Sequence, residues 1–485
     1  MTKEFKASDL FLPLPRPEYV ALPEGFISAL AWAALEVKGL ELETAAGKKV
    51  GLRYKISSGE LSTKTVEFRE TAPAGEALVD LLEVLEQHGI QELGNNNLLS
   101  ESVVLSIKGT SAAKSKFSPA SPLTPALALL QNNVGLTGKR SPADIARIFE
   151  VIYSLGRGGK PEASVAKLWL VASKLRLQND ALLRAIDSSF AQVVWKGGIS
   201  EVAVEPLALN TQMSSLLADT PFGWFADTWD KVTSDEWVMC LPARVWVDWA
   251  TGILRTAYAM SYLWESSWYE ALGRSMLLSD EPSDEFVEGV VKTMEPPLVW
   301  RGSDAPAEIR DVSSKLKWRC DKAVKIRMVI EKWAKDNDCM AEPIADFVNA
   351  FRKDSKALLD LQEALTPSKE AVSGSADNLW EAIRYSLKSR DATDYYGFLE
   401  NSGTRYLFPA PGIEWGAMFA SLSAKRAGLE TNLGEVAMSL ARSGTQPQTK
   451  ELLALLEQTG LARGSADADL AVAVESAFKP GMVTK

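Results

Sequence analysis

CLPARVWVDWATGILRTAYAMSYLW, residues 240–264, is the longest predominantly apolar stretch in this chain of 485 residues. Three charged residues, Arg244, Asp248 and Arg255, interrupt it. A membrane-spanning helix needs about 20 predominantly apolar residues, so we expect no membrane span here. The stretch instead predicts a helix buried in a protein core, where Arg244 and Asp248, four residues apart, can form an ion pair.

Tryptophan is concentrated around this stretch. Seven of the fifteen tryptophans lie within residues 220–270: Trp224, Trp229, Trp237, Trp246, Trp249, Trp264 and Trp268. Aromatic clusters can stack sugars or bases, but they more often fill the core of a large helical domain. We therefore predict core packing for this segment and leave open whether it binds a small molecule.

The composition is that of a globular protein, with 46% hydrophobic and 24% charged residues. At roughly 100–200 residues per domain, the length predicts about two to four domains. The net charge of −10 opposes nonspecific binding of the whole chain to nucleic acid. A local basic patch remains compatible with this charge.

The three cysteines, Cys240, Cys320 and Cys339, show no C-x-x-C spacing. So few thiols argue against a disulfide scaffold and a cysteine zinc site, and they predict buried, reduced cysteines. The first twenty residues, MTKEFKASDLFLPLPRPEYV, lack the basic start and apolar core of a signal peptide. We therefore expect a cytoplasmic protein without a membrane partner.

The predicted fold is mainly α and multidomain. Residues 1–108 predict a small α+β domain, because strand-like alternation and turn residues punctuate them. Its expected helices are Phe26–Val37 and Gly75–Gln87, and its expected strands are Gly39–Leu42, Val50–Ile56, Thr65–Arg69 and Val103–Ile107. Residues 109–124 are rich in Ser, Pro and Lys and predict a linker.

A large helical body is expected over residues 125–400, and it could divide into two subdomains near residue 200. Ser141-Pro142 is typical of a helix start, with serine as the N-cap and proline in the first turn. Further helices are predicted over Pro161–Leu177 and Asn179–Val193, and a loop over residues 373–377.

The C-terminal residues 405–480 predict a winged-helix-like module. Two apolar stripes with i, i+3, i+4, i+7 spacing define its first two helices: Trp415, Met418, Phe419 and Leu422, then Leu433, Val436, Ala437 and Leu440. Asn432 and Thr445 are expected to start the second and third helices as capping boxes. Gly444 and Gly460 end them, and Leu470, Val472 and Val474 predict a strand. The end of a helical bundle with a stray strand would give the same pattern.

In a DNA-binding winged helix, the third helix enters the major groove. Here that helix offers Gln446, Gln448, Thr449 and Lys450, and the wing offers Arg463 beside two aspartates. This positive charge is sparse. We therefore favour a structural or protein-contact role for the module, with DNA contacts through Lys450 and Arg463 as the alternative.

Residues for common catalytic sites are scarce. The chain has one histidine, His88, which sits at a predicted helix end and cannot build a histidine metal site alone. We find no G-x-S-x-G elbow and no ordered pair of carboxylates with a lysine on strand-like segments. We therefore predict no catalytic residue, no metal and no cofactor. A hydrolase with a carboxylate-bound metal remains as the second alternative.

Two segments resemble phosphate-binding loops, Gly135-Leu-Thr-Gly-Lys139 and Gly156-Arg-Gly-Gly-Lys160. Neither has the full G-x-x-x-x-G-K-[ST] pattern, and neither follows a clear strand. We interpret both as helix–helix loops. The alternative is a phosphate-binding edge made by Lys139, Arg140, Arg157 and Lys160.

The basic stretch KLKWRCDKAVKIRMVIEKWAK, residues 315–335, is the best nucleic-acid candidate. Cations interleaved with aromatic side chains can hold a phosphate backbone and stack a base. The candidate contacts are Lys315, Lys317, Trp318, Arg319, Lys322, Lys325 and Arg327. The alternative is an amphipathic helix in which Val324, Met328 and Trp333 pack and the lysines are solvated.

These patterns favour an interaction or scaffold protein over an enzyme. Our leading hypothesis is a non-catalytic subunit of an intracellular, bacterial multiprotein assembly, with other protein subunits as partners. The winged-helix pattern and the basic stretch suggest that the assembly acts on nucleic acid, as a genome-defence complex does. Direct binding of DNA or RNA by the chain is the first alternative.

Overall fold

The structure, a computed structural model, is mainly helical. It describes residues 5–20, 22–37, 53–55, 60–62, 76–87, 89, 102–103, 105–109, 120–130, 144–193, 195, 198–210, 212–278, 285–302, 304–366, 374–390, 394–402, 406–462 and 471–479. A single cluster of buried apolar side chains extends from the N-terminal residues to the C-terminal ones. The expected domain boundaries at residues 108, 124 and 400 stay predictions.

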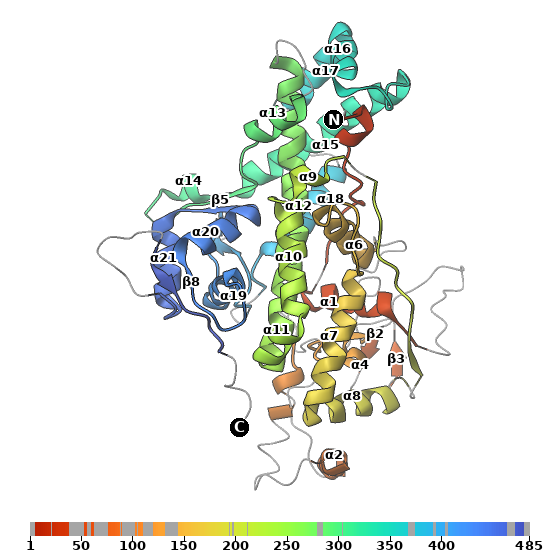
Figure 1. The fold of residues 1–485 in the computed structure, drawn as a ribbon, viewed down its shortest axis with the longest axis vertical. Helices are drawn as coiled ribbons and strands as arrows, with labels where there is room; N and C mark the ends of the chain where they lie inside the picture. Colours follow the sequence, from red (N-terminus) through yellow and green to blue (C-terminus); the bar gives the residue numbers. More distant parts are fainter. Residues whose placement is uncertain are drawn as a thin grey trace.

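The longest helix, α12 (Ala243–Leu278), forms the axis of the molecule (Figure 1). Its 36 residues correspond to a length of about 54 Å. Neighbouring helices surround it and bury its side chains on every face: α1 (Glu24–Ala34), α6 (Ile145–Gly156), α10 (Pro221–Thr233), α15 (Ser313–Asp336) and α18 (Gly374–Leu387). The buried helix predicted for residues 240–264 is therefore confirmed.

All seven tryptophans of residues 220–270 are buried, which confirms their predicted role in the core. Aromatic rings contact each other there, both within α12 and between α10 and α12. Trp264 and Trp268 stack with their ring centroids 6.1 Å apart, and Phe222 meets Trp264 edge to face at 5.6 Å. Such geometries add to the stabilisation that apolar burial gives.

The remaining described helices lie around this core. They are α2 (Glu76–Gln87), α4 (Pro125–Ala128), α7 (Val165–Asn179), α8 (Ala181–Val193), α9 (Ser214–Leu217), α11 (Asp235–Cys240), α13 (Phe286–Thr293), α14 (Ala307–Arg310), α16 (Ile344–Lys353), α17 (Ser355–Leu365), α19 (Ile413–Ser423), α20 (Leu433–Arg442) and α21 (Thr449–Gln458). None of these or of the other described helices combines the length and apolarity that a membrane crossing requires.

The described strands form two-stranded sheets. The antiparallel pairs are β1 (Leu35–Val37) with β4 (Ile199–Glu201), β2 (Arg53–Lys55) with β3 (Glu60–Ser62), β6 (Leu399–Ser402) with β7 (Tyr406–Pro409), and β8 (Thr431–Asn432) with β10 (Ala473–Val474). The parallel pair is β5 (Leu298–Trp300) with β9 (Thr445–Pro447).

The N-terminal strap, residues 5–20, runs along α12 (Figure 1). The strap begins with a short 3-10 helix, η1 (Ala7–Leu10). Beyond it, prolines at positions 13, 15 and 17 prevent a further helix and remove backbone donors, so the carbonyls need donors from elsewhere. The donors come from aromatic side chains of α12. Trp268 Nε1 donates to Leu10 O at 3.0 Å, and Tyr262 OH donates to Pro15 O at 2.7 Å. The Tyr258 hydroxyl accepts from Glu18 N and donates to Glu18 O, both at 2.7 Å.

Several local predictions are corrected by the structure. The strand expected at Val103–Ile107 is wrong, because residues 102–103 and 105–107 are helical. Val103 and Ile107 are buried while Leu105 is exposed, and an i, i+4 pair fits one face of a helix as well as it fits a strand. The expected strands at residues 39–42 and 65–69 lie outside the described residues.

Two helix starts also differ from the prediction. α6 begins after Asp144, whose carboxylate accepts from Arg147 N at 3.0 Å, so Asp144 and not Ser141 is its N-cap. Residues 374–377, expected as a loop, form the first turn of α18, where Ala376 is fully buried. Burial of one small apolar residue outweighs the weak helix propensity of the neighbouring Gly374 and Ser375.

The C-terminal segment follows the predicted helix order (Figure 1). Asn432 caps α20 by accepting from Glu435 N at 2.9 Å, which confirms that cap. The capping box expected at Thr445 is wrong, because Thr445–Pro447 form β9 and pair with β5 before α21 begins. Gly444 and Gly460 adopt φ values of +94° and +73°, which suit glycine after a helix.

The strap predicts a stability test. Tyr258→Phe removes the hydroxyl that serves both backbone groups of Glu18, so those groups lose their bonds inside the protein. We expect the free energy of unfolding to fall by about 1–3 kcal/mol, measured by urea denaturation. Tyr395→Phe is the matched control, because Tyr395 is exposed and should leave stability unchanged. An unchanged midpoint for Tyr258→Phe would show that the strap is not held by this hydroxyl.

Candidate functional site

The basic stretch folds into α15, and its cations face acidic partners within the chain. Arg319 is the most deeply buried, with 3% of its side chain exposed. Its guanidinium donates to Glu295 Oε2 at 2.9 Å and to the carbonyls of Pro296 and Pro297 at 3.0 and 2.8 Å. It also lies 3.4 Å from Glu270 Oε2. Arg319 therefore holds α15 against the segment that precedes β5.

The neighbouring candidates are paired in the same way. Their contacts are Lys315 with Glu295 at 3.5 Å, Lys317 with Asp377 at 3.7 Å, Lys322 with Glu270 at 3.0 Å, Lys325 with Asp321 at 2.8 Å, and Arg327 with Glu265 at 3.0 Å. A phosphate would have to compete with these carboxylates. The predicted role of these residues in binding nucleic acid is therefore weakened and stays a prediction.

The two tryptophans of α15 differ in their exposure and packing. Trp318 is 54% exposed, as a stacking role would require. Trp333 packs against Phe347 and Phe351 and donates from Nε1 to Asp354 at 2.9 Å. Met328, which the amphipathic alternative placed in the core, is 64% exposed.

The phosphate-loop candidates are similarly occupied. Arg157 pairs with Asp227 at 2.9 Å and also with Asp230, while Lys160 is exposed and has no ion pair among the described residues. Gly159 has φ +78°, and a Cβ there would lie 2.0 Å from Leu209 O. Close backbone packing thus explains this glycine. Lys139 and Arg140 lie outside the described residues.

The candidates of the C-terminal segment are not brought near α15. Lys450 pairs with Asp304 at 3.3 Å, and Gln448 accepts from Gly302 N at 3.2 Å. Gly302 and Asp304 therefore contact the start of α21. Arg463 and His88 lie outside the described residues.

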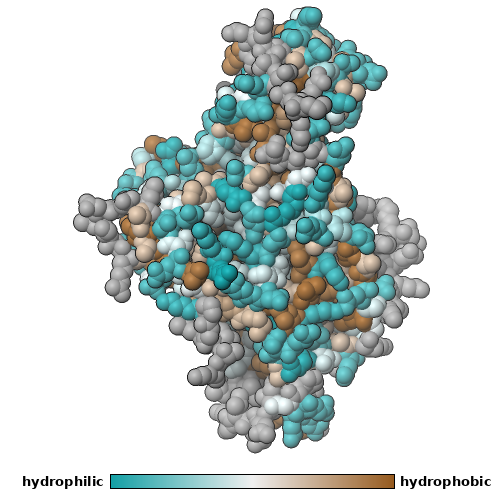
Figure 2. Space-filling model, viewed as in Figure 1, coloured by the Kyte–Doolittle hydropathy of each residue, from teal (hydrophilic) through white to brown (hydrophobic). Residues whose placement is uncertain are grey.

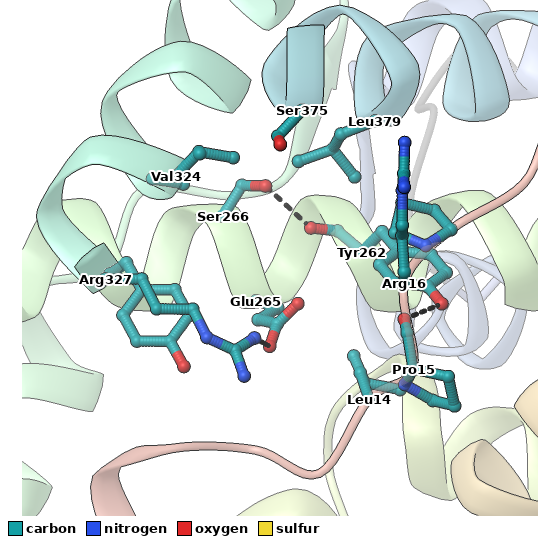
Figure 3. Close-up of a pocket in the computed structure, with 13 residues that line it drawn as sticks. Leu14, Pro15, Arg16, Tyr262, Glu265, Ser266, Val324, Arg327, Ser375 and Leu379 are labelled. Atoms are coloured by element: carbon teal, nitrogen blue, oxygen red, sulfur yellow. Dashed lines mark hydrogen bonds and ion pairs between the residues drawn. The ribbon is translucent and has the colours of Figure 1, made fainter. Parts of the chain in front are cut away.

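A pocket of about 250 Å³ lies between the strap, α12, α15 and α18 (Figure 3). We call it the strap pocket. It is lined by Leu14, Pro15, Arg16, Pro17, Tyr262, Glu265, Ser266, Tyr269, Ala323, Val324, Arg327, Ser375 and Leu379. Of the residues predicted from the sequence to bind nucleic acid or phosphate, Arg327 alone lines it.

Glu265 is the central charged group of the strap pocket. One of its carboxylate oxygens accepts from Arg327 Nη1 at 3.0 Å, and the other points away from that arginine (Figure 3). Burial raises the pKa of Glu265 to about 7, although the nearby Arg327 acts in the opposite direction. The carboxyl group can therefore accept or donate a proton near neutral pH.

Sequence reasoning missed Glu265 and Arg16 as site residues. Glu265 is one of three acids in the largely apolar helix α12, with Asp248 and Glu270, and a buried acid at such a position is a signal that could have been used. Arg16 belongs to the proline-rich strap, which has no periodicity to place it. The pocket forms only when segments about 250 residues apart in the chain meet.

Thiol and metal chemistry find little support in the described residues. Burial raises the pKa of Cys320 to about 12 and also raises the pKa of Cys240, so both thiols stay protonated at neutral pH. The prediction of buried cysteines holds for these two, whereas Cys339 is half-buried. In the described part of the chain, no group of three or more His, Cys, Asp or Glu side chains could hold a metal ion.

The role of Arg319 can be separated from that of an exposed cation on the same helix. Arg319→Ala removes a buried guanidinium that pairs with Glu270 and Glu295 and donates to two backbone carbonyls, so it should lower the free energy of unfolding by about 3 kcal/mol or more. Lys315→Ala should change it by less than about 0.5 kcal/mol, because Lys315 is largely exposed. Urea denaturation followed by circular dichroism measures both. Equal effects would contradict the structural role of Arg319.

The pKa of Glu265 predicts a pH dependence of stability. Because the folded-state pKa lies above the unfolded one, the stabilisation is complete below about pH 4.5 and is lost as pH rises through 7. The wild type should lose about 3 kcal/mol relative to Glu265→Gln between pH 4.5 and 8. Urea denaturation of both proteins across this range isolates the contribution of Glu265 to the free energy of unfolding, because the two proteins share all other titratable groups. A constant difference between them would contradict the prediction.

No protein-family model matches the chain, and no curated protein sequence matches it. The function is therefore inferred from the side chains of this chain.

Proposed function

We propose that the chain is a non-catalytic interaction or scaffold subunit of a multiprotein assembly. The observation that carries this proposal is an exposed apolar patch formed by α7 and β4. Val171 of α7 is 51% exposed, and Val202, which follows β4, is 37% exposed. Figure 2 shows hydrophobic residues gathered on this part of the surface, whereas hydrophilic residues cover much of the rest of that face.

Ion pairs place the two valines close together. Lys167 and Lys174 of α7 both pair with Glu201, the residue before Val202. Val171 lies between the two lysines on the same face of the helix. Half-buried Leu168, Leu175 and Val204 extend the apolar surface. Exposed apolar residues rimmed by charges are typical of a surface that another protein covers.

The C-terminal segment supports the same proposal. The order is α19, β8, α20, β9, α21 and β10, and apart from β9, which pairs with β5, this order with β8 paired to β10 is what a winged-helix-like module would give. In a DNA-binding module of this type, the third helix must be free to enter the major groove. Here Gln448, the N-cap of α21, accepts from Gly302 N, and Lys450 of the first turn pairs with Asp304. This packing favours a structural or protein-contact use over DNA reading.

Direct nucleic-acid binding is the competing proposal. The exposed Trp318 favours it, while the carboxylate partners of the α15 cations weigh against it. The finer expectations, that the assembly is intracellular and bacterial and acts on nucleic acid in genome defence, stay predictions. The carboxylate–metal hydrolase also stays an untested alternative.

The proposal predicts a partner that depends on the patch. The full chain should co-purify from its native cells with a stoichiometric protein partner that stays bound in size-exclusion chromatography. Val171→Glu should reduce the retained partner about tenfold or more, because a buried charge replaces an apolar contact. Leu359→Glu is the matched control, since Leu359 is an exposed apolar residue of α17 outside the patch.

The same purified chain distinguishes the nucleic-acid alternative. Fluorescence anisotropy with labelled duplex DNA, single-stranded DNA and RNA should show no binding. Affinity that falls steeply with salt, and that is lost in the double variant Lys315→Glu, Lys317→Glu, would replace the proposal with nucleic-acid binding. A partner retained equally by Val171→Glu would refute the role of the patch.

A further inference from the structure

We propose that the strap pocket binds a small organic anion, a monocarboxylate with a compact apolar body. This inference does not depend on the proposed interaction function. It rests on the size of the pocket, on its apolar walls and on the two guanidinium groups beside a buried carboxyl group (Figure 3).

The size of the pocket limits the ligand. A volume of about 250 Å³ corresponds to about eight water molecules at ~30 Å³ each. This is at or below the lower limit for drug-sized ligands, so an acid with a short or single-ring body fits. Leu14, Val324 and Leu379 provide apolar walls from the strap, α15 and α18.

The charges of the lining favour an anion. Arg16 and Arg327 are cationic, whereas Glu265 is the single acid of the lining. Arg16 is exposed at the rim beside Leu379 and has no ion pair among the described residues (Figure 3). Arg327 uses Nη1 for Glu265 and Nε for Glu331, and Nη2 makes no hydrogen bond within the described structure. Guanidinium groups bind carboxylates through charge-assisted hydrogen bonds.

Glu265 makes ligand binding at this site dependent on pH. Ionised, it would repel a carboxylate ligand, whereas protonated it can donate a hydrogen bond to that ligand. Its pKa of about 7, raised by burial, makes the protonated form accessible at neutral pH. Binding should therefore take up a proton, and affinity should fall as pH rises.

Among the described residues, Glu265 is the one carboxyl group that lines the pocket. The strap contributes Arg16, and α15 contributes Arg327 with Glu331 behind it. α12 contributes Tyr262 and Tyr269, whose pKa values burial raises further above 10. α18 contributes Ser375 and Leu379, which carry no charge. The pH profile of binding therefore reports on Glu265.

Isothermal titration calorimetry of the full chain with benzoate and isovalerate tests the proposal. Benzamide and isovaleramide are the uncharged controls of the same shape. Both carboxylates should bind, and both amides should bind at least about tenfold more weakly, since they lack the charge. With a pKa of about 7 for Glu265, carboxylate affinity should be about tenfold lower at pH 8 than at pH 6.

Three variants separate the roles of the side chains. Glu265→Gln should retain carboxylate binding with a flat pH profile, because the glutamine amide donates at any pH. Arg16→Gln should weaken binding several-fold and keep the pH profile. Arg426→Gln, a change of another exposed arginine on the C-terminal segment, should have no effect.

Several results would overturn the proposal. Amides that bind as tightly as the acids would show that the pocket selects a neutral group. Affinity that rises with pH, or that is abolished in Glu265→Gln, would show that an ionised Glu265 accepts from a donor ligand. Absence of heat with both acids at pH 6, in a chain that unfolds cooperatively, would exclude small monocarboxylates of this kind.

Discussion

A helix that is buried over most of its 36 residues must find a partner for every charged side chain that it carries inward, and this constraint shapes the structure around α12. Arg255 forms two hydrogen bonds with Asp394, at 2.7 and 2.9 Å, with both side chains almost fully buried. Glu265 and Glu270 receive Arg327 and Lys322 of α15. Glu270 lies five residues after Glu265 on α12, whereas its partner Lys322 lies five residues before Arg327 on α15. The ion pairs therefore fix both the antiparallel orientation and the register of the two helices.

Local features of the fold were predictable from the sequence. The apolar stretch at residues 240–264 and its tryptophans predicted a buried helix, because apolar residues without enough length for a membrane must pack in a core. The Asn432 cap was predictable because its hydrogen bond reaches only three residues along the chain. The pairing of β9 with β5 was not, because its partner lies about 150 residues away and Thr445–Pro447 alone resemble a helix start.

The function of charged residues was harder to predict than their position. The sequence around Arg319 reads as a basic helix with tryptophans, which suggested a phosphate-binding face. The acids that neutralise it, Glu270 and Glu295, belong to other segments, and no spacing rule connects them with α15. The candidate pocket was missed for the same reason, since its four walls come from the strap, α12, α15 and α18. Periodicity describes one element at a time, whereas a site depends on how the elements meet.

The strap contributes Leu14, Pro15, Arg16 and Pro17 to the pocket and is itself held by Tyr258, Tyr262 and Trp268. One wall of the cavity is thus a segment without regular secondary structure, fastened mainly through its carbonyl groups. Occupancy of the cavity and attachment of the strap are consequently linked equilibria. A ligand that fills the cavity stabilises the attached form of the strap. By linkage, attachment of the strap strengthens binding of that ligand by the same free energy. Residues 5–20 would then report, at the molecular surface, whether the interior is occupied.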